Sequence, residues 1–292
     1  MPVPETVKFG RIGLVSKPRR PDIKDLAPGL LEWLAARGLA CRYDLQTADY
    51  IGSGEGIRRE ELASWADLLI VLGGDGTLLA AARAASAHNI SLLAVNLGGL
   101  GFLMTTGTHE LYGVLEGVLG GEYHLQCRTM LRGHLVRDGA VIASWDALND
   151  LVVNKAAMAR VIDLDAYVDE EFVCSYRADG LIVSTPTGST AYSLSAGGPV
   201  IFPSVSAMVV TPICPHTLTN RPVVLPETAQ VEIVLNSAND SSYLTVDGQV
   251  GRELHSRDRI RCSVSPHKVH LIQPQRVRFF EVLRNKMKWG ES

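Results

Sequence analysis

The segment Leu68-Leu69-Ile70-Val71-Leu72-Gly73-Gly74-Asp75-Gly76-Thr77 decides the fold of the first part of the chain. It opens with an entirely apolar run, which is typical of a central parallel strand covered on both faces. The alanine-rich segment from Thr77 to Ala87 follows and predicts a helix. A strand, a glycine turn and a helix in this order indicate an α/β layer with a parallel sheet.

Strands and helices alternate around this segment, and the pattern changes after residue 125. Further strands are expected at 8–15, 40–44 and 91–95, and a helix over 22–37. The later part holds short β-rich segments bounded by Gly, Pro, Asn or Asp turns. The sequence therefore predicts a Rossmann-like α/β domain over 1–124 and a β-rich, sandwich-like domain over 125–274. A helix over 276–288 is expected to pack back on the first domain, which residues 275–292 complete.

Composition excludes several classes of protein. The 292 residues carry a net charge of -3, and 46% are hydrophobic, as in ordinary soluble globular proteins. This balance argues against bulk attraction to nucleic acid or to an anionic membrane, and no apolar run approaches the ~20 residues of a membrane span. The N-terminus lacks a secretory signal pattern, so a cytoplasmic location is expected. The five cysteines form no Cys-x-x-Cys pair, which argues against a disulfide framework or a structural zinc site.

The glycine turn predicts a phosphate site. Gly73 and Gly74 allow a ligand to approach the backbone, and the free amides at the start of the helix favour an anion. The turn is neither a Walker A motif nor a Gly-x-Gly-x-x-Gly motif. Asp75 would repel phosphate unless it holds a cation or takes a proton from an attacking hydroxyl, which favours phosphoryl transfer. The alternative is that Asp75 or Thr77 caps the helix.

Three other segments are candidates for ligand contacts. The glycine loop 96–103 follows the next strand and lies at the same edge of the predicted sheet, although a structural turn explains it equally well. The hydroxyl-rich run 184–195 suits a ribose, an amide or a phosphate, and Tyr192 offers a flat face; the alternative is a Ser/Thr-rich turn. Asn149-Asp150 suits a ribose diol or an adenine amine, or forms an Asx turn. Asp247-Gly248-Gln249 has the pattern of a hairpin turn.

Together these segments resemble the NAD kinase family. The matching motifs are Gly73–Thr77, Asn149-Asp150, Arg177–Pro199, Thr211–Leu218 and Asp247–Gln249, in family order over nearly the whole chain. The resemblance implies phosphoryl transfer from ATP to the 2′-hydroxyl of the adenosine ribose of NAD, giving NADP, with a divalent cation such as Mg²⁺. It also implies a cleft between the two domains and a cytoplasmic homodimer or homotetramer. Polyphosphate as donor and NADH as acceptor remain open.

The resemblance also assigns residues. Asp75 would be the proton acceptor, with Gly73, Gly74 and Thr77 as candidates for the phosphate loop. The NAD contacts would come from Asp75, Gly76, Asn149, Asp150, Arg160, Arg177, Asp179, Thr190, Ala191, Tyr192, Ser193, Leu194, Ser195 and Gln249. No residue is assigned to the metal.

The second glycine loop departs from the family pattern Asn-Arg-Gly-x-Leu-Gly-Phe-Leu-Thr-Asp. Leu97 replaces the arginine, and Met104-Thr105 replaces Thr-Asp. An arginine there could contact phosphate or form an internal ion pair, so its loss bears on the handling of the phosphate donor or on details of the interface. The alternatives are a lipid or sugar kinase with the same turn, or a non-catalytic dinucleotide sensor. An NAD-dependent oxidoreductase is disfavoured, since no Gly-x-Gly-x-x-Gly motif follows the first strand.

Overall fold

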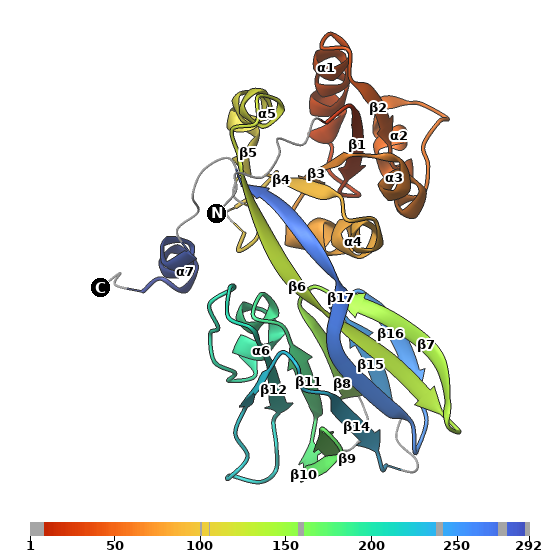
Figure 1. Cartoon of the computed structure of the whole chain (residues 1–292), viewed down its shortest axis with the longest axis vertical. Helices are drawn as coiled ribbons and strands as arrows, with labels where there is room; N and C mark the ends of the chain where they lie inside the picture. Colours follow the sequence, from red (N-terminus) through yellow and green to blue (C-terminus); the bar gives the residue numbers. More distant parts are fainter. Residues whose placement is uncertain are drawn as a thin grey trace. The chain divides into compact units, whose positions relative to one another are not determined.

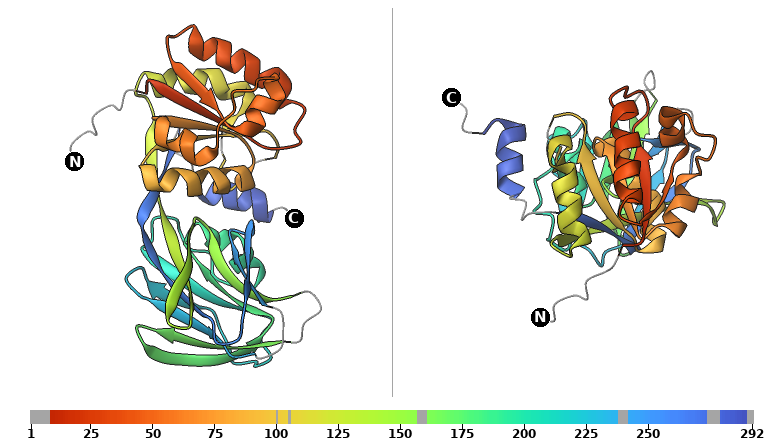
Figure 2. Two further views of the ribbon diagram at one scale, coloured as in Figure 1. Left: turned by 90° about the vertical axis from the view of Figure 1, so that its right-hand side faces the viewer. Right: turned by 90° about the horizontal axis from the view of Figure 1, so that it is seen from above.

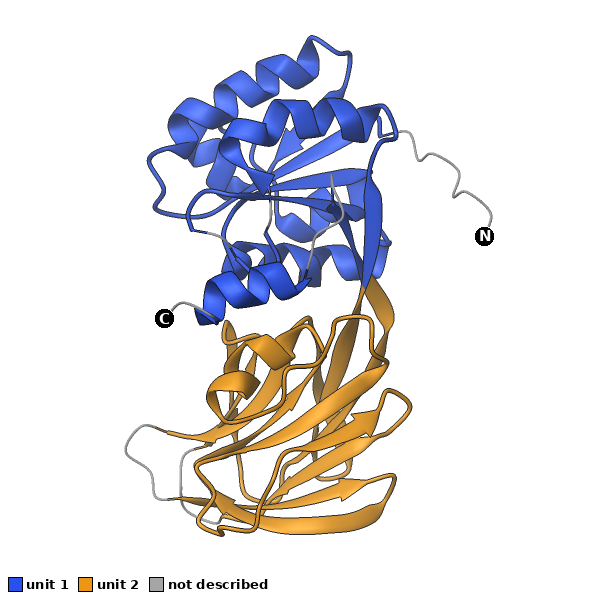
Figure 3. Cartoon of the chain, turned by 90° about the vertical axis from the view of Figure 1, so that its left-hand side faces the viewer, with its two compact units in different colours: residues 1–127, 269–292 blue, residues 128–268 orange. Residues whose placement is uncertain are grey.

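The structure, a computed structural model, describes residues 9–99, 101–104, 106–156, 161–237, 242–273 and 279–289. The chain forms two compact units, which are coloured separately in Figure 3. Unit 1 contains Met1–Cys127 together with Val269–Ser292, and unit 2 contains Arg128–Lys268. The boundaries fall within two long strands, β6 (His124–Arg137) and β17 (Arg259–Gln273), so each strand contributes residues to both units.

Unit 1 is built on a parallel sheet with the strand order β17-β4-β3-β1-β2 (Figure 1). Its other strands are β1 (Arg11–Ser16), β2 (Ala40–Tyr43), β3 (Leu68–Gly73) and β4 (Ser91–Asn96), and the short β5 (Thr106–Gly107) pairs with β4. All six residues of β3 are buried, as the apolar run predicts. The predicted parallel α/β fold is therefore confirmed.

Helices cover both faces of this sheet. They are α1 (Ile23–Ala35), α2 (Leu45–Ile51), α3 (Arg59–Trp65), α4 (Asp75–Ala85) and α5 (Leu111–Leu119), with 3₁₀ turns at Ser86–His88 and Thr108–Glu110. The C-terminal helix α7 (Phe279–Met287) also belongs to unit 1. Leu68, Ile70 and Leu72 share a core with side chains of α1 and α5. On the opposite face, Gly13 leaves room for Leu62 of α3. In the left view of Figure 2, the strands of unit 1 lie between α1 and α5 on one side and α4 on the other.

Two features of unit 1 differ from the sequence-based expectation. The helix after the glycine turn begins at Asp75 rather than Thr77, since Gly74 is the last residue with an extended backbone. Asp44 was expected at the end of a strand. It instead caps α2, where its carboxylate accepts the N–H of Thr47 at 2.9 Å. An aspartate at this position satisfies an amide that has no partner inside the helix.

Unit 2 consists of two antiparallel sheets. Its remaining strands are β7 (Ala140–Ala147), β8 (Asp150–Lys155), β9 (Ile162–Val168), β10 (Glu171–Ala178), β11 (Gly180–Ser184), β12 (Ala207–Ile213), β13 (Val223–Pro226), β14 (Val231–Leu235), β15 (Ser242–Val246) and β16 (Val250–Leu254). One sheet has the order β10-β9-β14-β17-β6-β7, and the other β13-β12-β11-β8-β15-β16. One apolar core draws on strands of both sheets, as in a β-sandwich. The predicted β-rich second part is confirmed.

Helical structure is sparse in unit 2. A 3₁₀ turn at Gly188–Thr190 and the short α6 (Tyr192–Ser195) follow β11 directly. This is the segment that the sequence marks as hydroxyl-rich. Across the described residues of the whole chain, no helix has the length and apolar character that crossing a bilayer requires.

Candidate active site

Asp75 holds its carboxyl group at the carboxyl end of the parallel sheet of unit 1. The Phe102 N–H donates to Oδ2 of Asp75 at 3.2 Å. The other oxygen, Oδ1, is buried and has no hydrogen-bond partner in the described part of the chain. Gly101 lies so close to this carboxyl that a Cβ atom there would overlap with Oδ1. An oriented carboxylate with one unused oxygen is suited to accept a proton or to bind a cation.

The helix-capping alternative for Asp75 and Thr77 is not what the structure contains. Gly74 occupies the N-cap position of α4, and no side chain caps this end of the helix. The Thr77 N–H instead donates to the Gly74 carbonyl at 2.8 Å. The side chain of Asp75 is therefore not used to start the helix.

The two glycine loops of unit 1 end at the same edge of the sheet, as predicted. Gly73 is the register partner of Asn96, and the Leu97 N–H donates to the Gly73 carbonyl at 2.9 Å. Asn96 shapes the second loop, because its amide donates to the Gly99 carbonyl at 2.8 Å and accepts from the Gly98 N–H at 3.0 Å. A Cβ built on Gly74 or Gly99 would meet no atom within 4 Å. Both loops thus present open backbone where a phosphate can approach.

A basic turn lies beside these loops and was not assigned a role from the sequence. The Lys17 N–H extends the β1–β3 pairing by donating to the Leu72 carbonyl at 2.8 Å. Arg20 donates from Nη2 to the Leu97 carbonyl and pairs with Asp22 at 2.6 Å. Tyr50 anchors the turn through the Arg20 N–H and the Lys17 carbonyl. The side chains of Lys17 and Arg19 are exposed.

This arrangement bears on the departure at position 97. Where the family loop carries an arginine, this chain has Leu97, and Arg20 brings a guanidinium group to the backbone of that residue. A Cβ atom on Gly98 would lie 3.9 Å from Nη1 of Arg20. In the other departure, Met104-Thr105, Met104 is buried and Thr105 lies outside the described residues.

In unit 2, Asn149 and Asp150 lie at the start of β8, beside the β15–β16 turn. Asp150 is 4% exposed, and its carboxyl group lies near enough to that of Asp247 for their negative charges to repel. Burial and the negative charge of Asp247 raise the pKa of Asp150 to about 7. Asp247 and Gly248 have positive φ angles of 51° and 63°, which is consistent with the predicted hairpin turn.

The hydroxyl-rich run is partly used for internal bonds. Thr185, Ser189 and Ser193 are buried. The Ser189 hydroxyl donates to the Pro186 carbonyl at 2.7 Å and accepts the Ile201 N–H at 2.9 Å. The Ser193 hydroxyl lies 2.9 Å from that of Thr211. Tyr192 remains exposed, as does Ser195. The run therefore builds its own turn, which the turn interpretation predicts, and leaves only some of its side chains accessible to a ligand.

The other candidate NAD contacts have varied surroundings. Asp179 forms an ion pair with Lys155, with 2.8 Å between Oδ1 and Nζ. Arg177 is exposed on β10, and its carbonyl accepts the His216 N–H at 2.9 Å. Gln249 follows the β15–β16 turn and donates its N–H to the Val246 carbonyl at 3.0 Å. Arg160 lies outside the described residues.

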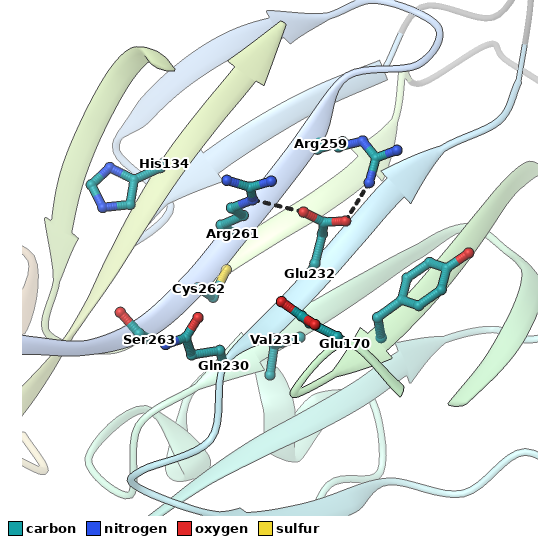
Figure 4. Close-up of a pocket in the computed structure, with 10 residues that line it drawn as sticks. His134, Glu170, Gln230, Val231, Glu232, Arg259, Arg261, Cys262 and Ser263 are labelled. Carbon is teal, nitrogen blue, oxygen red and sulfur yellow. Dashed lines mark hydrogen bonds and ion pairs between the residues drawn. The ribbon is translucent and has the colours of Figure 1, made fainter. Parts of the chain in front are cut away.

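None of the predicted site residues lines the cavity of about 710 Å³ in unit 2 (Figure 4). It is lined by His134, Tyr167, Glu170, Gln230, Val231, Glu232, Arg259, Arg261, Cys262 and Ser263. Figure 4 shows Glu232 between Arg259 and Arg261, and it pairs with them at 2.6 and 2.7 Å. Because the two cations share one carboxylate, and Glu170 adds a second, the cavity offers little net charge to a ligand.

Comparison with known proteins decides the family. The profile of the ATP-NAD kinase N-terminal domain matches residues 12–123, and that of the ATP-NAD kinase C-terminal domain matches residues 148–274. The chain belongs to the NAD kinase family. The NAD kinase of Solibacter usitatus is 54% identical over 279 residues, covering 96% of this chain and 97% of that protein. The NAD kinase of Koribacter versatilis is 50% identical, covering 96% and 98%.

Solved structures of this family have the same fold. A yeast NADH kinase complexed with NADH superimposes with a TM-score of 0.90 at 26% identity, covering 100% of this chain and 94% of that one. An NAD kinase from Archaeoglobus fulgidus in complex with ATP gives 0.75 at 22% identity, covering 95% and 98%. The predicted family, fold and phosphotransferase class are thus confirmed. A lipid or sugar kinase and a non-catalytic sensor are not favoured.

Proposed function

We propose that this NAD kinase family member transfers the terminal phosphoryl group of ATP to the 2′-hydroxyl of the adenosine ribose of NAD, with Asp75 as general base. The observation that carries the catalytic assignment is the buried Oδ1 atom of Asp75, which has no partner among the described residues. A buried carboxylate oxygen without a donor is costly, and a substrate hydroxyl would satisfy it.

The proposed reaction uses a single carboxylate, that of Asp75, as its base. A ribose hydroxyl is a poor nucleophile at neutral pH and needs a base within hydrogen-bond reach. Asp75 accepts the hydroxyl proton while the ribose oxygen forms a bond to the terminal phosphorus of ATP. The bond between that phosphorus and its bridging oxygen breaks, and ADP leaves. The bond from Phe102 to Oδ2 fixes the carboxyl orientation, which keeps Oδ1 available.

The phosphate donor is assigned to the open glycine edge of unit 1. Gly74 offers open backbone for close approach, whereas Gly73 is buried against Thr77, which lies in the first turn of α4. Lys17 and Arg19 add exposed positive charge beside these loops, which suits a triphosphate or a polyphosphate. Arg20 stabilises the second loop through the Leu97 carbonyl, so in this chain the basic turn stands in for the missing arginine.

The acceptor is assigned mainly to unit 2. The candidate contacts are Asn149, Asp150, Arg160, Arg177, Asp179, the segment Thr190–Ser195 and Gln249, with Asp75 and Gly76 from unit 1. Support comes from Asp150, Tyr192 and Gln249, which belong to neighbouring turns of one unit. The reduced coenzyme is a second possible acceptor, since the yeast relative is an NADH kinase complexed with NADH.

The divalent cation that such a reaction requires is assigned as Mg²⁺. Within the described ranges, no group of three His, Cys, Asp or Glu side chains is arranged to hold a metal. Mg²⁺ does not need such a group, because it is often held by one or two carboxylates, substrate phosphates and water. Because Oδ1 of Asp75 is assigned to the ribose hydroxyl, the cation would be held mainly by the donor phosphates and water. When bound, the cation would neutralise charge on the donor phosphates.

Location and assembly are also part of this proposal. The net charge of -3 and the family membership support a cytoplasmic enzyme. The family resemblance supports a homodimer or homotetramer.

One assay tests the activity. The purified protein is incubated with ATP, NAD and Mg²⁺, and NADP is detected with an NADP-specific dehydrogenase. Parallel reactions replace ATP with polyphosphate and NAD with NADH. Formation of NADP that depends on the donor is the expected result. Binding of NAD without any NADP would identify a sensor and contradict the proposal.

A further inference from the structure

The turn that carries Asn149 and Asp150 is held from two sides. On one side lies Asp247, whose carboxylate accepts three backbone N–H groups. The Asn149 N–H donates to Oδ1 at 2.7 Å and the Asp150 N–H to the same atom at 3.3 Å, while the Leu148 N–H donates to Oδ2 at 3.3 Å. The Asp247 N–H donates in return to the Asp150 carbonyl at 3.0 Å. Asp247 is 7% exposed, so these bonds are shielded from water.

On the other side lies Thr185, which is fully buried. Its N–H donates to the Asn149 carbonyl at 2.9 Å, and its hydroxyl donates to the Leu148 carbonyl at 2.6 Å. The same hydroxyl accepts the Gly188 N–H at 3.0 Å. Gly188 touches the Asn149 carbonyl so closely that a Cβ atom there would overlap with it. The amides of residues 148–150 are thus satisfied by Asp247, and the carbonyls of Leu148 and Asn149 by Thr185.

We propose that Asp247 and Thr185 are positioning residues for the dinucleotide acceptor and act by fixing the backbone of Leu148-Asn149-Asp150 between them. This inference rests on the proposed function, because it takes Asn149 and Asp150 as acceptor contacts. Both residues direct their polar atoms at the backbone of the turn, so none of these bonds uses the Asn149 or Asp150 side chain. Short hydrogen bonds from rigid strands hold a site to the narrow tolerance that binding requires.

Positioning the turn is a different role from stabilising the fold of unit 2. Asp258 is a matched control for the second role. Asp258 is also buried in unit 2, where it is 1% exposed, and it accepts the His255 N–H at 2.8 Å. It pairs with Arg137 at 2.7 Å, and none of its contacts involves residues 148–150. A change at Asp258 removes a buried carboxylate without touching the turn.

The test compares Asp247→Asn, Thr185→Val, Thr185→Ser and Asp258→Asn in the full chain. In Asp247→Asn, the side chain keeps one acceptor oxygen but directs an NH2 group at the Leu148 N–H. In Thr185→Val, the side chain keeps the shape of threonine without its hydroxyl. Each should raise the KM for NAD by about tenfold, since each leaves a buried backbone group unpaired. The KM for ATP should stay within about twofold. Thr185→Ser keeps the hydroxyl and should restore the KM for NAD. Asp258→Asn should lower Tm but leave this KM unchanged.

Calorimetric titration with NAD alone separates the two claims. Weaker NAD binding by Asp247→Asn and Thr185→Val supports the positioning role, even if the wild-type protein forms no NADP and the proposed function fails. The inference is overturned if both variants bind NAD with the native Kd, whatever their loss of Tm. It is also overturned if the wild-type protein does not bind NAD.

Discussion

Gly101 lies directly against the carboxyl group of Asp75, and a side chain at position 101 would occupy the space of the Oδ1 atom. The neighbouring Phe102 N–H holds Oδ2 of the same carboxyl. The segment Gly101-Phe102 of the second glycine loop therefore fixes the position of the proposed base and determines which of its oxygens has no hydrogen bond. Gly101 thus makes room for the aspartate.

Gly101→Ala should reduce kcat by about 10- to 100-fold, because small displacements of a reacting group have effects of this size. The added methyl group would push the Asp75 carboxyl away from its present position. Steady-state kinetics with NAD and ATP measure the change. The matched control is Gly99→Ala, since a Cβ atom at Gly99 meets nothing within 4 Å. Equal loss of kcat in the two variants would show that the loop is merely intolerant of substitution.

Lys17→Ala should raise the KM for ATP by about tenfold, as expected for the loss of one charged hydrogen bond. Lys17 follows β1 at the edge where the glycine loops end. The KM for NAD should not change. Arg11→Ala is the control, because Arg11 begins the same strand at the opposite edge and pairs with Asp67. An ATP KM equally high in both variants would contradict an assignment of the basic turn to the donor.

The stability of the protein should fall as pH rises from about 4 to 7, through the titration of Asp150. Burial and the charge of Asp247 raise the pKa of Asp150 from 3.8 to about 7 in the folded state. Between these two pH values the folded state therefore binds a proton that the unfolded state releases. The resulting contribution to the free energy of unfolding is present below pH 4 and is lost as the pH rises through 7. A shift of this size corresponds to on the order of 4 kcal/mol.

Asp150→Asn cannot ionise and should remove this part of the pH dependence. Urea unfolding at pH 5 and pH 8 in the absence of NAD measures it. Asp258→Asn is the comparison. Burial acts to raise the pKa of Asp258, but the hydrogen bonds from Arg137 and the His255 N–H, together with the positive charge of Arg137, outweigh it and lower this pKa. Its contribution is lost only at acidic pH, so Asp258→Asn should keep the wild-type change between pH 5 and pH 8. If the free energy of unfolding of Asp150→Asn differed between pH 5 and pH 8 as much as that of the wild type, the pH dependence would not come from Asp150.

The sequence predicted those parts of the fold whose signal is local. The apolar run Leu68–Leu72 and the glycines after it gave the buried strand and the turn that the structure contains. The helices α2 and α3 were not predicted. Each is short and buries only two residues, so neither produces a clear helical period.

The site was predicted in its residue types but not in its supporting contacts. Asp75 stood out because a carboxylate is unusual in a phosphate-binding turn. Asp75 contacts Gly101, which belongs to a second loop that follows another strand. No pattern within a short stretch of sequence predicts this contact. The hydroxyls of Ser189 and Ser193 looked available from the sequence, but burial commits them to internal bonds. Asp247 was correctly placed in a hairpin turn, yet its bonds to residues 148–150 join segments far apart in the chain.

The most direct test of the account is the turnover of Asp75→Asn, measured with saturating NAD and ATP beside its Kd for NAD. Asparagine preserves the size of the side chain but cannot take the ribose proton. The account predicts a loss of kcat of at least ~10²-fold, within the range of general base catalysis, with NAD affinity changed by less than about threefold. Near-native turnover in this variant would contradict the assignment of Asp75 as the base.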